Sequence, residues 1–240
     1  MIADCKNRNE YGIPNKDKIG RSSHESLICF VCRYIEVFVQ KKSRMSDSED
    51  KISRDLIVFL NQKSRTEETI FQFVSQDLEE ESTGVVDIGI YSSSSQGAFF
   101  DAIYYSDDKR YFCFEAKILG VNDNQRIKEY VIGHRKNGKY IPCGGIERYK
   151  RCIHGAELTN AALIGYMKRD NYDFWFRKIN QWILELSEES EFWSDRELLQ
   201  SYNMPQDLSF ARYFSTHKRE DKEGISRPDI NLNHIWMKIE

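Results

Sequence analysis

The sequence predicts a mixed α/β fold in one domain, and three features of the chain lead to this prediction. The 240 residues are 40% hydrophobic and 13% aromatic, which is enough to form one packed core. Stretches with a helical spacing of apolar residues are interspersed with short β-branched stretches typical of strands. Their order is irregular, without the strict alternation that gives a doubly wound parallel sheet. We therefore expect a central mixed sheet flanked by helices.

The N-terminal part of the chain is expected to be polar first and helical afterwards. Residues 1–22 are rich in Gly, Asn and Lys and predict a loose tail. Apolar residues three or four apart predict a helix over 24–42, and a second amphipathic helix begins near Ser48. We assign residues 1–45 to a polar tail and helical N-terminal extension, and residues 46–240 to the main domain.

Strands are expected in the middle of the chain. Residues 67–76 predict an amphipathic piece or a strand, and VVDIGIY at 85–91 is a β-branched strand pattern. AFFDAIYY at 98–105 is expected to pair with that strand across a serine-rich turn, and YFCFEAKIL at 111–119 predicts a further strand. These segments are expected to be neighbours in one sheet.

The second half of the chain returns to a mixture of helices and strands. The expected elements are a helix over 145–153, a short buried strand over 162–167, an amphipathic helix over 175–189, and two terminal strands over 207–220 and 229–239. This mixture again favours a mixed α/β core.

Composition and charge exclude several classes of protein. The net charge of −3 excludes a histone-like polycation, and no apolar run approaches the roughly 18 residues that span a bilayer. The N-terminus has no apolar signal core, so we expect a cytoplasmic protein with reduced cysteines and no membrane partner. Cys29 and Cys32 form a CxxC pair within an apolar helical pattern and lack a second ligand pair, which favours core cysteines over a zinc site.

The positive charge is concentrated in one part of the chain. Residues 126–151 contain eight lysines and arginines against two glutamates. Such segregation is compatible with nucleic-acid binding even in a chain that is acidic overall.

The candidate chemistry lies on two of the predicted strands. Glu115 and Lys117 are two residues apart and therefore face the same side of an apolar strand. Asp87 interrupts a second apolar strand in the same way. Buried charges of this kind are costly unless they are paired or bound to a ligand. Two carboxylates and a lysine suit a Mg²⁺ or Mn²⁺ site that hydrolyses phosphodiesters.

At these positions the sequence resembles the PD-(D/E)XK nuclease superfamily. Asp87 matches the first acid of the motif, and Glu115-x-Lys117 matches the (D/E)xK element. Glu49 matches an acid on the preceding helix that often joins the metal site in such families. Further similar segments, together covering roughly residues 48–240, are SEDKIS (48–53), KEYVIG (128–133), GGIERYKRCIHG (144–155), ALIGYM (162–167) and NLNHIWMKI (231–239).

The resemblance implies a restriction-endonuclease-like fold and a metal-dependent nuclease. Asp87, Glu115 and Glu49 are implied as metal ligands and catalytic residues, with Lys117 positioning the attacking water. DNA is the implied substrate, with RNA as the other candidate, and bacterial genome defence is implied by the resemblance alone. A homodimer would be needed to cut both strands together, and the need for an activating partner protein is left open.

Four residues that follow the catalytic strand are candidate nucleic-acid contacts. Arg148, Lys150 and Arg151 have helical spacing and suit phosphate binding, although they equally suit a solvated helix face. His154 is a further candidate for a phosphate contact, and the alternative is an interaction with the C-terminal dipole of the helix.

Three alternatives remain open from the sequence. Along the sequence, Asp101 lies closer to the predicted strand of Glu115 than Asp87 does. Asp101 could therefore be the metal ligand instead, although we favour Asp87. The chain could also be a catalytically silent nuclease-like module that binds nucleic acid or a partner protein. A cysteine hydrolase using Cys143 or Cys152 with His154 is a third hypothesis.

Overall fold

The structure is a computed structural model and describes residues 23–41, 46, 48–79, 84–120, 126–202 and 209–239. The tail predicted over residues 1–22 lies outside the described residues.

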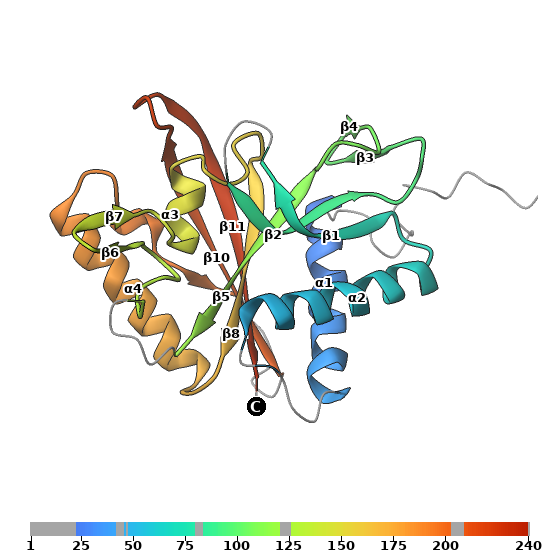
Figure 1. The fold of residues 1–240 in the computed structure, drawn as a ribbon, viewed down its shortest axis with the longest axis horizontal. Helices are drawn as coiled ribbons and strands as arrows, with labels where there is room; N and C mark the ends of the chain where they lie inside the picture. The colour runs from blue at the N-terminus through green and yellow to red at the C-terminus, as the bar shows by residue number, and fades with distance from the viewer. Residues whose placement is uncertain are drawn as a thin grey trace, which may run out of the picture.

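A seven-stranded mixed sheet forms the centre of the molecule (Figure 1). Three central strands, β5, β8 and β11, run parallel to one another, and the remaining neighbours are antiparallel. In sheet order the strands are β1 (Phe71–Leu78), β2 (Val85–Ser92), β5 (Phe112–Leu119), β8 (Asn160–Met167), β11 (Ser226–Lys238), β10 (Phe210–Glu220) and β9 (Gln200–Ser201).

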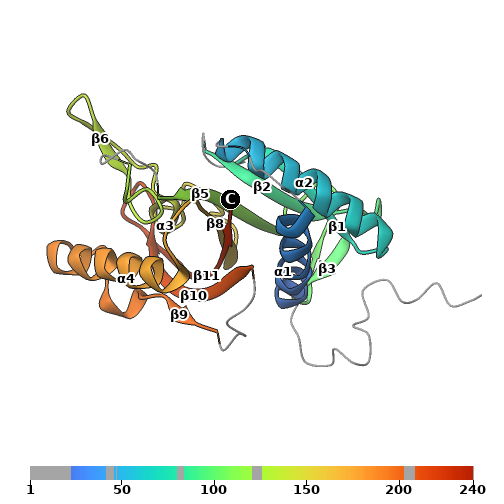
Figure 2. The ribbon, with the colours of Figure 1, turned by 90° about the horizontal axis from the view of Figure 1, so that it is seen from below.

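Two pairs of helices cover opposite faces of the sheet, as Figures 1 and 2 show. On one face lie α1 (Ser23–Lys41) and α2 (Glu49–Thr66), and on the other lie α3 (Gly145–Lys150) and α4 (Tyr172–Glu189). A short 3-10 helix, η2 (Asp195–Glu197), follows α4. In the described parts of the chain, no helix has the length and apolar character needed to cross a membrane.

The first helix is packed as a full part of the core. Its buried side chains, among them Leu27, Val31 and Ile35, share one apolar cluster with α2 and with the strands β2, β5, β8 and β11. The structure therefore confirms a mixed α/β fold with two N-terminal helices packed on a mixed sheet.

The segment 98–105 differs from its expected pairing. It forms a separate hairpin of β3 (Ala98–Phe100) and β4 (Ile103–Tyr105), with Asp101 and Ala102 at positive φ in the turn. Strand β2 pairs with β1 and β5 instead. The prediction that 98–105 continues the sheet beside 85–91 is wrong, because a two-residue turn folds the segment back on itself.

A second small hairpin leads into α3. It consists of β6 (His134–Lys136) and β7 (Lys139–Ile141) and extends away from the sheet, as Figure 2 shows. The turn that leads into this hairpin is tied to α3 by backbone hydrogen bonds, including one from Gly145 N–H to the Glu129 carbonyl (2.9 Å). The hairpin and α3 therefore form one structural unit beside β5.

Candidate active site

The candidate site lies where β2 and β5 separate. The two strands pair only between Ile88–Ile90 and Phe112–Phe114, so the next backbone N–H groups of β5 on that side lose their strand partner. Buried N–H groups need an acceptor. Asp87 Oδ2 accepts from Ala116 N–H at 2.7 Å, and Glu49 Oε2 accepts from Ile118 N–H at 2.8 Å. The separation of the strands thus brings two of the predicted acids to β5.

Glu115 and Lys117 project from the same face of β5, as their spacing predicts. Lys117 Nζ lies 2.6 Å from Glu115 Oε1 and 3.5 Å from Glu49 Oε1. Glu115 is wholly buried, and Lys117 retains 8% of its surface. The structure therefore brings Asp87, Glu115, Lys117 and Glu49 together from two strands and one helix.

Two groups from the α3 region also contact Glu115. Arg148 Nη1 lies 2.8 Å from Glu115 Oε1 and forms a hydrogen bond with it. His154 Nδ1 lies 3.1 Å from Glu115 Oε2, within ion-pair distance but without hydrogen-bond geometry. Glu115 Oε2 is therefore a buried carboxylate oxygen with no hydrogen-bond partner among the described residues.

Burial and neighbouring charge shift the pKa values at this site in different directions. Burial raises the pKa of Asp87 to about 8, and the Glu115 charge adds to the increase. Burial also raises the pKa of Glu49, although Lys117 opposes it. Burial would raise the pKa of Glu115, but its contacts with Lys117, His154 and Arg148 outweigh burial and hold the pKa well below its usual range.

The pKa of Lys117 moves upward for a related reason. Burial alone would lower it, but the carboxylates of Glu115, Glu49 and Asp87 outweigh burial and raise it above its usual value. Lys117 therefore remains a cation at neutral pH. It can orient a water molecule or stabilise a phosphate charge, whereas service as a proton acceptor would require a changed environment.

The residues predicted to contact nucleic acid have different surroundings. Arg148 is partly exposed beside Glu115, and Arg151 is partly exposed, paired with Glu147 and stacked on Phe192. The fully buried Lys150 lies 2.5 Å from Glu197 Oε1. Such burial does not fit the phosphate contact expected of Lys150.

His154 also has a different environment from the one expected. It retains only 1% of its surface and contacts Glu115. Because its side chain is buried against Glu115, His154 could contact a phosphate only if that phosphate were bound at the candidate site. Helical spacing alone did not predict that α3 ends at Lys150 and that the chain then turns inward.

An open cavity of about 1010 Å³ borders the site on the α3 side. Arg148 and His154 line it together with Arg151, Arg227 and Lys222, and with the acids Asp221 and Glu223. The cavity therefore reaches the two residues that contact the wholly buried Glu115 carboxylate.

The alternative ligand Asp101 lies in the β3–β4 turn. Its carboxylate accepts hydrogen bonds from Ser23 N–H (2.6 Å) and His24 N–H (3.3 Å) and forms a 2.7 Å contact with His24 Nδ1. These bonds connect the hairpin to the start of α1. Asp87, by contrast, bonds directly to β5 beside Glu115.

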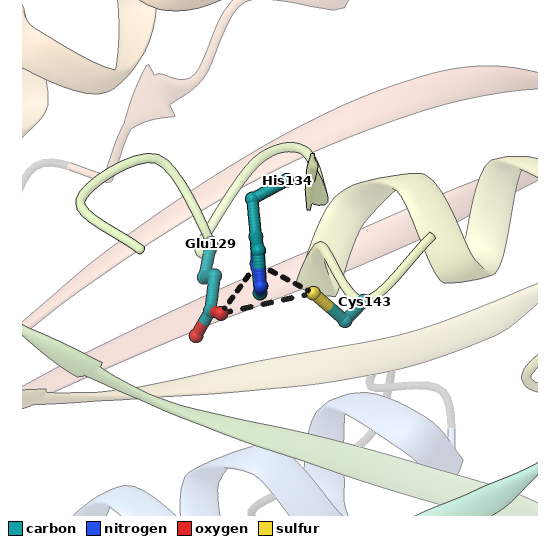
Figure 3. Close-up of side chains that lie close together, drawn as sticks. All are labelled: Glu129, His134 and Cys143. Carbon is teal, nitrogen blue, oxygen red and sulfur yellow. Dashed lines mark hydrogen bonds and ion pairs between the residues drawn. The ribbon is translucent and has the colours of Figure 1, made fainter. Parts of the chain in front are cut away.

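One cluster near the site was not predicted from the sequence. Glu129, His134 and Cys143 point toward one another beside the β6–β7 hairpin (Figure 3). Among the described residues, this is the only group of three or more His, Cys, Asp or Glu side chains whose ligand atoms all lie within 4.8 Å of one another. The spacing of five and nine residues matches no familiar ligand motif, so only the folded hairpin brings the three together.

The geometry does not pair Cys143 with His154, as one form of the cysteine hydrolase hypothesis requires. Cys143 Sγ lies 3.3 Å from His134 Nδ1, whereas His154 contacts Glu115. Glu129 approaches the same Nδ1, so no relay can pass through the ring of His134. Burial, together with the Glu129 carboxylate, raises the pKa of the Cys143 thiol, which is the opposite of what a nucleophile needs.

Comparison of the chain with family models, with curated proteins and with solved structures gave no match. The fold and the geometry of the site therefore carry the functional argument.

Proposed function

We propose that this protein is a metal-dependent nuclease of the PD-(D/E)XK type, with a restriction-endonuclease-like fold, that hydrolyses phosphodiester bonds in DNA. The observation that carries the proposal is the meeting of Asp87, Glu49 and the Glu115–Lys117 pair where β2 leaves β5. These residues come from three elements, and buried charges are costly unless they are paired, hydrogen-bonded or coordinate a metal.

The donor set fits a hard divalent cation. Mg²⁺ and Mn²⁺ prefer oxygen ligands, and Asp87, Glu115 and Glu49 would supply carboxylate oxygens. The buried Glu115 Oε2 lies 3.1 Å from His154 Nδ1 without hydrogen-bond geometry, and it is the oxygen of Glu115 that would bind such an ion. When bound, the ion would polarise a phosphoryl oxygen and lower the pKa of an attacking water.

The remaining residues have roles that follow from their charge and position. Lys117 would orient the attacking water and stabilise the charge that develops on the phosphate. Arg148 would bind a non-bridging phosphate oxygen, since its guanidinium is partly exposed at the cavity and already touches Glu115. Arg151 lines the same cavity and would be a second phosphate contact.

Further positive charge suits contact with the nucleic-acid backbone at a distance from the reacting phosphate. The tip of the β6–β7 hairpin exposes Arg135, Lys136 and Lys139, and the hairpin extends from the same side as α3. Such backbone contacts supply a large share of the affinity of proteins for duplex DNA. A homodimer would allow both strands to be cut together, and a role in bacterial genome defence rests on the sequence resemblance alone.

The experiment that tests the proposal compares labelled substrates of different classes. Duplex DNA, single-stranded DNA and single-stranded RNA are incubated with the protein in Mg²⁺ or Mn²⁺. We expect cleavage of DNA that is abolished by Glu115→Gln. Equal cleavage of all substrates by wild type and Glu115→Gln would indicate a contaminant and would contradict the assignment.

A second candidate function is a catalytically silent module that uses the same fold to bind nucleic acid or a partner protein. One observation favours it: Lys117 lies between Glu115 and Glu49, and among the described residues these acids do not form a compact group of three ligands. Thermal unfolding with and without Mn²⁺ separates the two candidates. An active site should be stabilised by Mn²⁺ in a manner that Asp87→Asn abolishes, whereas a silent module should show no such difference.

A further inference from the structure

The three side chains of Glu129, His134 and Cys143 offer three different ligand atoms to one small space (Figure 3). His134 Nδ1 lies 2.9 Å from Glu129 Oε1 and 3.3 Å from Cys143 Sγ, and Sγ lies 3.7 Å from the same Oε1. Ligands around a tetrahedral Zn²⁺ ion are about 3.4 to 3.6 Å apart, given the usual metal–ligand bond lengths. The three atoms are therefore already within about 0.5 Å of the separations that a zinc ion requires.

The backbone fixes the two loops that carry these ligands. Gly145 N–H and Ile146 N–H donate to the carbonyls of Glu129 and Tyr130, at 2.9 and 3.1 Å. The wholly buried Glu147 accepts from Gly133 N–H on the hairpin side. A ligand set held by existing backbone contacts requires little reorganisation to bind an ion.

The charges of the three side chains also suit a divalent metal ion. A Glu carboxylate and a Cys thiolate together neutralise a divalent ion, and a combination of sulfur, nitrogen and oxygen suits zinc rather than magnesium. Arg126 forms hydrogen bonds to both oxygens of Glu129, at 2.8 and 2.9 Å, and about half of its side chain is exposed. The bond from Arg126 to Glu129 Oε1 competes with a metal ion for that oxygen. If Arg126 bonded to Oε2 alone, Oε1 would be free to bind the ion, and Arg126 would still orient the carboxylate.

We propose that Glu129, His134 and Cys143 bind a zinc-class transition metal, with a fourth position left for water or another ligand. The ion would connect the base of the β6–β7 hairpin to the start of α3. Since α3 carries Arg148, the metal would fix the helix that touches Glu115. This site differs from the proposed Mg²⁺ site in its residues and in its preferred metal, and it does not depend on nuclease activity.

Cobalt substitution tests the proposal directly. Co²⁺ is titrated into the metal-free, full-length protein, and the thiolate-to-cobalt charge-transfer absorption and the d–d bands of tetrahedral Co²⁺ are recorded. We expect one Co²⁺ per chain with a thiolate band, and displacement of the Co²⁺ by Zn²⁺. Cys143→Ser should abolish the band and weaken binding by more than about 100-fold, the upper end for losing only an outer partner.

Matched variants identify the cause of any loss. Cys29→Ser alters another partly buried cysteine and should keep the band, as should Glu115→Gln, which alters only the proposed nuclease site. His134→Asn should lose metal binding with an unchanged circular dichroism spectrum, and it serves as the test if Cys143→Ser does not fold. Absence of the thiolate band in wild type, its persistence in Cys143→Ser, or unchanged metal binding by His134→Asn would each overturn the proposal.

Discussion

At the scale of single residues, the site depends on a lysine that is surrounded by acids. Lys117 contacts Glu115 and Glu49, and Asp87 completes the acidic surroundings through its bond to Ala116 N–H. The same electrostatic arrangement keeps Lys117 charged and Glu115 ionised despite their burial. Removing any one charge should therefore change both the stability and the chemistry of the site.

Lys117→Met should reduce DNA cleavage by about 100-fold to 10,000-fold, because the water and the developing phosphate charge lose their positioning cation. The matched control is Asp101→Asn, which alters the competing candidate ligand in the β3–β4 turn. The control should retain cleavage, since Asp101 bonds to Ser23 and His24. Loss of cleavage in Asp101→Asn, with full activity in Lys117→Met, would contradict the assignment of the site.

Asp87→Asn should change how stability depends on pH in the absence of metal. The pKa of Asp87 is raised from 3.8 to about 8, so the folded protein binds this proton more tightly than the unfolded chain does. Between these values, wild type loses stability as the pH rises, by at most about 1.4 kcal/mol per pH unit from this group.

Asn cannot titrate, so the stability of Asp87→Asn relative to wild type should increase from about pH 5 to about pH 8. Urea unfolding in EDTA at both pH values measures the difference. A constant difference would show that Asp87 has an ordinary pKa in the folded protein.

The sequence predicts the relative placement of those candidate residues whose geometry local spacing determines. Glu115 and Lys117 share a face because residues two apart in a strand do so, and the structure brings Asp87 to the neighbouring strand. The contacts of Arg148 and His154 with Glu115 were not predicted, because they depend on where α3 ends. The burial of Lys150 against Glu197 was missed for a similar reason, since its partner lies 47 residues away.

At the scale of elements, α2 positions Glu49 through its packing on the sheet. The Ser53 hydroxyl on α2 lies 2.8 Å from the Tyr166 hydroxyl on β8, and both residues are buried. This bond fixes the first turns of α2, which carry Glu49 toward β5. The helix is thus tied to the sheet by a polar contact as well as by apolar packing.

Ser53→Ala and Tyr166→Phe should each lower the free energy of unfolding by about 1 to 3 kcal/mol, because each leaves a buried hydroxyl without its partner. The double variant should cost less than the sum of the two single variants, since it removes both hydroxyls together. Denaturant unfolding of the four proteins of the cycle measures the coupling. Strict additivity would show that the two hydroxyls do not interact.

The β6–β7 hairpin should contribute long-range affinity for DNA. Replacing Arg135, Lys136 and Lys139 with Ser should weaken duplex binding and reduce the salt dependence of the binding constant. The slope should fall by roughly 0.9 for each phosphate that the hairpin no longer neutralises. An unchanged salt dependence of the binding constant would show that the hairpin does not contact the DNA. The matched control replaces three exposed cations of α1 and α2: Arg33, Lys41 and Arg65.

The elements themselves were more predictable than their partners. The helices at 23–41 and 172–189 and the strands at 85–92 and 112–119 follow from apolar spacing and β-branching. The sequence of 98–105 also has a strand pattern, but its turn at Asp101 and Ala102 directs it into a separate hairpin. Strand propensity describes a segment and does not specify the strand with which it pairs.

At the scale of the whole molecule, the sheet joins segments that are distant in sequence. Strand β8 pairs in parallel with β5 and with β11, which begins more than 60 residues after β8 begins. The mixed α/β class was predictable from the irregular order of helices and strands, whereas this strand order was not. The order matters for the proposed site because it places β5 in the interior, with one pair of helices on each face.

The most direct test of the central claim is cleavage of supercoiled plasmid DNA. The full-length protein is incubated with plasmid in Mg²⁺ or Mn²⁺, beside parallel samples with EDTA and with Glu115→Gln. We predict nicked and then linear plasmid in the metal-containing wild-type samples, and intact supercoiled plasmid in both controls. Cleavage that persists in EDTA or in Glu115→Gln would contradict a metal-dependent nuclease centred on Asp87, Glu115 and Lys117.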